Sequence, residues 1–300
     1  MLKIKNLKEM NKAFKKIGLS GPIKNKKDES FIRGVVDCLS KQGIEILSEK
    51  SLMDNSNYLN QFSVEDAEFI KRIDLLVSVG GDGTMLRNAR KFGKNKIPIL
   101  GINLGTLGFL TDIQTDDPLS RLVDVVNGKY ILDKRPFLEA KLNSKQLSST
   151  ALNEIVLHSG AIAKMMEFSL FIDKSFVYSQ KADGLIIFSP TGSTAYSLSG
   201  GGPLVDPQLN IIGISPMFPH SINTTPILIN GDKEIRIELS KSLNNQGSQL
   251  SFDGQENIKL KKESVLTIRN SKQNIRLVHP VDDDFFSRCR NKLGWGRSIT

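Results

Sequence analysis

The sequence predicts an α/β plus β fold: an N-terminal Rossmann-like α/β domain followed by a β-rich domain of the β-sandwich type. Up to about residue 130, short runs rich in Val, Leu and Ile alternate with stretches of helical apolar spacing. From about residue 136, strand-like segments follow one another with few helices between them. A tail that begins with three aspartates, 282–284, has the pattern of a capped helix that packs back on the first domain. The predicted domains are 1–135, 136–280 and a helical tail, 281–300.

The first domain is expected to open with a strand–helix–strand unit. Its helix places Ile32, Val35, Val36 and Leu39 on one face, and Gly43 ends it. The crossover between the flanking strands should be right-handed. Strands are expected at 16–21, 44–47, 73–79 and 97–103, and helices at 31–41, 85–92 and 119–126.

The second domain is expected to consist mainly of β-strands. Residues 235–239 alternate apolar and charged side chains, as in a strand with one buried face. Two packed layers of sheet are the natural arrangement of so many strands. The other expected strands are 137–142, 150–158, 167–172, 185–188, 211–214, 227–229 and 265–268.

A glycine-rich turn follows the apolar run 73–79 and precedes a helical stretch. Gly80, Gly81 and Gly83 let the backbone bend sharply and approach a ligand, and their N–H groups at a helix N-terminus favour phosphate. Asp82 within this turn has two interpretations. It caps the helix, as Thr84 also could, or it serves as a catalytic base or helps to hold a metal ion beside the phosphates.

A second glycine turn, 105–110, follows the next strand, and the two turns should form one crevice because neighbouring parallel strands end at the same sheet edge. Neither the G-x-G-x-x-G fingerprint nor the Walker motif is present. A third motif, 183–203, runs from an apolar strand into a stretch of hydroxyl residues and three glycines. Its interleaved Ala195, Tyr196 and Leu198 argue against a flexible linker, and its hydroxyls suit ribose and amide groups.

Composition limits the function classes. Lys+Arg 41 against Asp+Glu 32 gives a net charge of +9, which favours anionic partners such as nucleotides. Two distant cysteines and three histidines offer neither a disulfide framework nor a zinc spacing. No apolar stretch is long enough to span a membrane, and the N-terminus lacks a signal-peptide core, so a cytoplasmic protein is expected.

Together these motifs resemble the NAD kinases. The resemblance rests on the 80–84 turn, on 101–112, on Asn153-Glu154, on 183–203 and on 253–255. It implies transfer of the γ-phosphoryl group of ATP to the 2′-hydroxyl of the NAD adenosine ribose, with Asp82 as general base and Mg²⁺ or another divalent cation accompanying ATP. It also implies a homodimer or homotetramer, and neither a prosthetic group nor a protein-held metal. Nucleic acid and membrane are not expected partners.

The resemblance also assigns binding residues. Asn153 and Glu154 correspond to the pair that holds the adenosine part of NAD, and Asp183 to the residue at its nicotinamide end, with Lys181 nearby. The remaining NAD- or ATP-binding residues that it implies are Gly80, Gly81, Gly83, Arg87, Lys164, Thr191, Ser193, Thr194, Ala195, Tyr196, Ser197, Leu198, Ser199 and Gln255. Asp253 could simply serve its turn. Leu104 stands where many bacterial relatives have an arginine.

Two other functions share parts of this pattern. A diacylglycerol or sphingoid-type lipid kinase would have the glycine turn but would need an apolar groove for its acyl chain. A non-catalytic NAD(P)-sensing protein would bind the dinucleotide without turnover and would have no use for Asp82.

Overall fold

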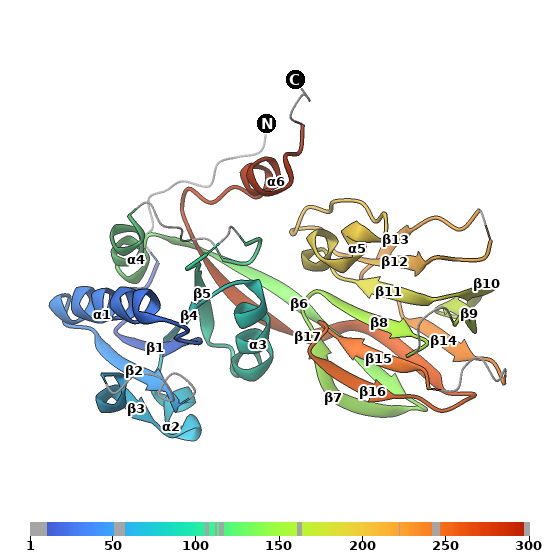
Figure 1. Cartoon of the computed structure of the whole chain (residues 1–300), viewed down its shortest axis with the longest axis horizontal. Helices are drawn as coiled ribbons and strands as arrows, with labels where there is room; N and C mark the ends of the chain where they lie inside the picture. Colours follow the sequence, from blue (N-terminus) through green and yellow to red (C-terminus); the bar gives the residue numbers. More distant parts are fainter. Residues whose placement is uncertain are drawn as a thin grey trace. The chain divides into compact units, whose positions relative to one another are not determined.

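We describe the protein from a computed structural model, which covers residues 11–50, 58–105, 108–111, 113, 117–160, 164–221, 223–241 and 247–296. The chain divides into two compact units (Figure 1). Unit 1 consists of Met1–Lys134 and Ile275–Thr300, and unit 2 of Arg135–Asn274. The predicted division into three domains stays a prediction.

Unit 1 is built on a parallel sheet in the order β17-β5-β4-β1-β2-β3. The predicted α/β half is therefore confirmed. Its strands are β1 Lys16–Ser20, β2 Glu45–Glu49, β3 Ser63–Val64, β4 Leu75–Val79, β5 Pro98–Ile102 and the last residues of β17 Val265–Pro280. Its helices are α1 Lys26–Lys41, α2 Asp66–Arg72, α3 Asp82–Phe92, α4 Pro118–Val126 and α6 Phe285–Leu293, with 3₁₀ turns at Leu59–Phe62 and Gly93–Asn95.

Helices cover both faces of this sheet (Figure 1). Side chains alternate along a strand, so Ile17 and Leu19 of β1 pack in one core with α1 and α4. Gly18 faces the other side, where a Cβ would come within 2.5 Å of the Phe69 ring of α2. Phe69 in turn packs on Phe92 of α3. Strand β1 is therefore buried on both faces from Ile17 onward.

Unit 2 consists of two sheets with a shared core, as predicted. One has the order β10-β9-β14-β17, with β6 pairing β17 and β7, and the other the order β13-β12-β11-β8-β15-β16. Residues of both sheets, such as Phe168 and Ile155, meet in one buried cluster. The strands not yet given are β6 Tyr130–Leu142, β7 Lys145–Ala151, β8 Glu154–His158, β9 Met166–Ile172, β10 Ser175–Ala182, β11 Gly184–Phe188, β12 Ile211–Met217, β13 Ile227–Asn230, β14 Ile235–Leu239, β15 Gln249–Phe252 and β16 Glu256–Lys259.

The helices differ from the predicted ones mainly at their starts. Helix α1 begins at Lys26, because the Asn25 side chain accepts bonds from the N–H groups of Lys27 and Asp28. The charged residues expected to form a loop are thus its first turn. Helix α3 begins at Asp82 rather than at Met85, and α2 was not predicted at all.

The C-terminal helix α6 belongs to unit 1, as predicted. The Asp284 side chain caps it by accepting from the N–H groups of Phe286 and Ser287, and Gly294, with φ +66°, ends it. Among the described helices, α6 included, none is both long and apolar enough to cross a membrane.

Candidate active site

The first glycine turn lies where β4 passes into α3. Gly80 has φ +146°, and a Cβ there would lie 2.6 Å from the Thr84 hydroxyl oxygen. Gly81 is the N-cap of α3 and Asp82 its first residue. The N-terminal end of the α3 dipole makes this turn favourable for phosphate.

The Asp82 carboxylate bonds to the second glycine turn. Its Oδ2 accepts from Phe109 N at 2.9 Å and its Oδ1 from Leu110 N at 3.0 Å. The carboxylate therefore bonds to the second turn rather than capping α3, whose N-cap residue is Gly81. The expected meeting of the two turns is confirmed by these bonds, although Thr106 and Leu107 lie outside the described residues.

Lys292 also contacts Asp82, which sequence reasoning missed. Its Nζ is 3.3 Å from Asp82 Oδ2, and about a third of each side chain is exposed. Within the described ranges, no group of three or more His, Cys, Asp or Glu side chains could hold a metal ion. Asp82 is thus a carboxylate held by two amides and a cation rather than part of an acidic cluster.

Behind the turn, Glu49 at the end of β2 is fully buried. Arg87 donates to Glu49 Oε2 at 3.2 Å and to the Ser20 hydroxyl at 3.0 Å, and Lys91 Nζ lies 2.6 Å from Glu49 Oε1. Burial alone would lower the pKa of Lys91, but hydrogen bonds with Asp66 and Glu49 outweigh it and raise that pKa. Arg87, a predicted nucleotide contact, is therefore engaged in the fold itself.

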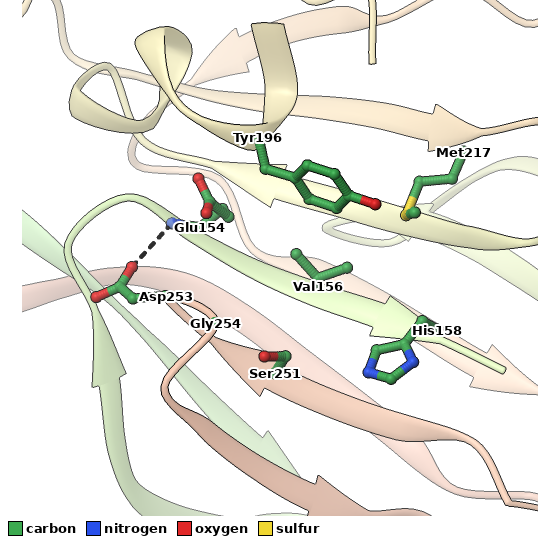
Figure 2. A pocket seen from close by; sticks show the side chains of 8 residues that line it. All are labelled: Glu154, Val156, His158, Tyr196, Met217, Ser251, Asp253 and Gly254. Carbon is green, nitrogen blue, oxygen red and sulfur yellow. Dashed lines mark hydrogen bonds between the residues drawn. The ribbon is translucent and has the colours of Figure 1, made fainter. Parts of the chain in front are cut away.

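A pocket of about 420 Å³ lies in unit 2 (Figure 2). Because side chains alternate along β8, Glu154, Val156 and His158 share its pocket face, while Ile155 and Leu157 enter the core. Figure 2 shows the Tyr196 ring extending from α5 toward Met217 of β12. The lining is completed by Ser251, Asp253 and Gly254. Its volume suits part of a nucleotide-sized ligand.

Asp253 positions the start of β8. Its Oδ2 accepts from Leu152 N at 2.9 Å, and its Oδ1 accepts from Asn153 N at 2.8 Å. The same Oδ1 also accepts from Glu154 N at 3.2 Å (Figure 2). The residue has φ +50° in the turn after β15. Sequence analysis allowed it only a role in its turn, yet it fixes the predicted Asn153–Glu154 pair from about a hundred residues away.

Glu154 is a buried carboxyl at the edge of the pocket. Burial, and next the charge of Asp253, raises the pKa of Glu154 to about 8, although the Tyr196 N–H donates to it. Glu154 Oε2 and Asn153 Oδ1 are buried and have no hydrogen-bond partner within the described part of the chain. Two buried oxygens without partners are acceptor positions that a ligand could fill.

The hydroxyl-rich motif forms the 3₁₀ turn Thr191–Thr194 and the short helix α5 Tyr196–Ser199. Three of its hydroxyls bond to nearby backbone: Ser193 accepts from Val205 N, Ser197 donates to Gly192 O and Thr194 donates to Thr191 O. These bonds lie within the segment or join it to Val205. Gly192 also lies so close to Asn153 that a Cβ there would come within 2.2 Å of the Asn153 carbonyl oxygen. Of this motif, Tyr196 lines the pocket.

The other predicted binding residues lie around unit 2 rather than in the pocket wall. Asp183 joins β10 to β11, and its N–H donates to Met217 O. Lys181 and Gln255 are exposed, and Lys164 is half-buried ahead of β9. Sequence reasoning left His158, Met217 and Ser251 out of the site. The alternation from Glu154 could have indicated His158, whose pKa burial lowers.

Comparison with known proteins decides the family. The ATP-NAD kinase N-terminal domain matches residues 22–130, and the ATP-NAD kinase C-terminal domain matches residues 152–280. The chain belongs to the NAD kinase family. It is 41% identical over 292 residues to an NAD kinase of Marinobacter nauticus, covering 95% of this chain and 98% of that protein. An NAD kinase of Aeromonas salmonicida is 38% identical, with 97% of this chain and 100% of the relative covered.

Solved NAD kinase structures resemble this NAD kinase along most of its length. The yeast NADH kinase complexed with NADH has a TM-score of 0.83 at 25% identity, covering 96% of this chain and 90% of that one. An NAD kinase from Archaeoglobus fulgidus in complex with ATP has a TM-score of 0.71 at 25% identity, covering 95% and 100%. The lipid-kinase and sensor alternatives find no support. Leu104 packs its apolar side chain on the unit 1 core.

Proposed function

We propose that this NAD kinase transfers the γ-phosphoryl group of ATP to the 2′-hydroxyl of the NAD adenosine ribose, with Asp82 as the general base. The observation that carries this proposal is the bonding of the Asp82 carboxylate. A carboxylate has about four acceptor positions. Oδ2 uses two of them for Phe109 N–H and Lys292, whereas Oδ1 uses one for Leu110 N–H. Among the described residues, this leaves a position on Oδ1 for the proton of a hydroxyl.

The reaction needs only positioning and one proton transfer. The 2′-oxygen attacks the γ-phosphorus, the bond from that phosphorus to the β,γ-bridging oxygen breaks, and ADP leaves. The hydroxyl proton moves to Asp82 Oδ1, and the phosphate forms on the ribose. The N-terminus of α3, where the 80–83 turn ends, would stabilise the phosphate charge in this step.

We assign Mg²⁺, or another divalent cation, to the ATP substrate. The acidic residues present do not form a metal site of their own within the described ranges, and Asp82 is already bonded to two amides and an ammonium group. Mg²⁺ commonly binds through substrate phosphates and water with little help from protein ligands.

For the dinucleotide, we assign the adenosine part of NAD to Asn153 and Glu154, since both present buried oxygens without partners among the described residues. Tyr196 would lie against the ligand in the same pocket. Asp183 and Lys181 are assigned to the nicotinamide end. The remaining assignments carry over from the family resemblance: Arg87, Lys164, Gln255, the 80–83 turn and the stretch 191–199.

We further propose a homodimer or homotetramer that forms through unit 2, and a cytoplasmic location. Unit 2 exposes several large apolar side chains, which support self-association: Phe176, Leu209, Phe218 and Leu228. Both cysteines are free thiols, which agrees with a reducing compartment. Sedimentation at several protein concentrations tests the assembly.

The test of Asp82 is a phosphoryl-transfer assay with ATP, Mg²⁺ and NAD, coupled to an NADP-specific dehydrogenase. Asp82→Asn should keep NAD binding, because the unit 2 pocket is untouched, but lose turnover by at least about a hundredfold, because an amide cannot accept the proton. Asp124→Asn, an exposed aspartate on α4, is the matched control and should turn over like the wild type. Near-wild-type turnover of Asp82→Asn would refute the assignment.

A further inference from the structure

Lys292 and Asp82 are 210 positions apart in the sequence but form an ion pair in unit 1. We propose that Lys292 is a positioning residue of the NAD kinase reaction: its ammonium group holds the Asp82 carboxylate so that Oδ1 faces the hydroxyl that is phosphorylated. This inference rests on the proposed role of Asp82.

The same ammonium group contacts both sides of the Asp82 environment. It lies 3.3 Å from Asp82 Oδ2 on α3, and 4.6 Å from the centre of the Phe109 ring. The N–H of Phe109 donates to that same Oδ2. Three segments therefore meet at Asp82 Oδ2: α3 carries the carboxylate, the 108–110 turn donates an N–H to it, and α6 contributes the Lys292 ammonium group.

Several contacts help to place helix α6 and the residues that lead into it. Arg288, whose side chain is 8% exposed, pairs with Asp283 just before the helix. His279 Nε2, also buried, lies 3.4 Å from Asp133 Oδ2. The Asp284 cap fixes the first turn, and the helix ends one residue after Lys292. Lys292 thus projects from a short, anchored segment rather than from a free tail.

A contribution to the stability of the fold does not by itself explain the ion pair between Lys292 and Asp82. An ion pair with both side chains about a third exposed adds little to the stability of a fold, as does an exposed cation–π contact. Its location offers a better explanation. A negative charge inside a turn that favours phosphate would repel the nucleotide, and the adjacent cation offsets that repulsion while fixing the carboxylate.

Three variants test this inference in the coupled assay. Lys292→Met should lower kcat by about ten- to a hundredfold, the scale expected when a catalytic group is misplaced. Its dissociation constant for NAD should stay within about twofold of the wild type, because the pocket residues are untouched. Lys292→Arg should restore most of kcat, since it returns a cation to the site.

Arg290→Met is the matched control, because it removes a cation from the same helix at a side chain that pairs with Asp284 instead. It should keep wild-type kcat. A loss of kcat shared equally by Lys292→Met and Arg290→Met would overturn the inference, because the helix rather than the Asp82 contact would then be responsible. Wild-type kcat in Lys292→Met would overturn it too.

The double variant separates this inference from the role of Asp82. If Lys292 acts through Asp82, adding Lys292→Met to Asp82→Asn should lower the residual turnover no further. A further tenfold loss would show that Lys292 acts on its own and would overturn the inference. Full turnover of Asp82→Asn by itself would refute the general base instead, whatever Lys292→Met does.

Discussion

The Cα of Gly108 lies so close to the Asp82 carboxylate that a Cβ there would come within 2.1 Å of Oδ1 and 2.3 Å of the Thr111 hydroxyl oxygen. Gly108→Ala should therefore displace the carboxylate from the Phe109 and Leu110 amides. We expect kcat to fall by about tenfold or more while NAD binding is retained, because a general base loses its effect when misplaced. Steady-state kinetics of the purified variant measures this.

The control for Gly108→Ala is Gly34→Ala in helix α1. A Cβ at Gly34 would meet only Leu119 Cδ1 at 3.8 Å, an ordinary contact. This variant should keep wild-type kcat and gain about 0.5–1 kcal/mol of stability, since alanine favours a helix over glycine. If Gly108→Ala kept wild-type kcat as well, the contact with Asp82 would have no bearing on turnover.

A second prediction concerns Asp253, which holds three consecutive backbone N–H groups at the start of β8. Asp253→Asn tolerates the positive φ of this position but turns an amide N–H₂ toward one of those donors. It should lose about 1–3 kcal/mol of unfolding free energy and bind NAD more weakly, because Asn153 and Glu154 lose their anchor. Urea denaturation and a binding titration measure the two effects.

Asp173→Asn provides the comparison for Asp253→Asn. Asp173 also has a positive φ and accepts from a backbone N–H, that of Glu234, but it is exposed to solvent. Asp173→Asn should lose less unfolding free energy than Asp253→Asn and should leave NAD binding unchanged. Equal losses of stability and affinity in the two variants would mean that burial of the Asp253 carboxylate is unimportant.

The first glycine turn and its contact with the second could be predicted from the sequence. Neighbouring parallel strands end at the same edge of a sheet, so the order of the strands is enough to bring their turns together. The sequence also allowed Asn153 and Glu154 to be selected by resemblance. Alternation along β8 could have added Val156 and His158, whereas the pairing of β8 with β15, which brings Ser251 into the wall, is a tertiary fact.

The features that the sequence did not reveal have two physical reasons. Lys292 and Asp253 act on residues far away in the sequence, and no local pattern encodes those contacts. Strand β10 was missed because much of it is exposed, so its sequence is polar. The first turn of α1 was taken for a loop because its charged residues face solvent, although Asn25 signals the cap.

The third prediction uses the pKa of Glu154, which is raised from 4.5 to about 8 in the folded protein. The folded state therefore holds a proton that the unfolded state has already lost between those pH values, so the stability of the wild type falls as pH rises from about 4.5 to about 8. Glu154→Gln cannot ionise and escapes this loss. Relative to the wild type, it should become more stable by on the order of a few kcal/mol as pH rises from about 5 to about 8.

Thermal unfolding of both proteins without nucleotide, across that pH range, measures the difference. Glu263→Gln, at an exposed position, controls for the loss of one negative charge from the protein. A Glu154→Gln advantage that stays constant with pH would mean that the carboxyl ionises alike in both states. In that case burial next to Asp253 would not keep Glu154 protonated in the folded protein.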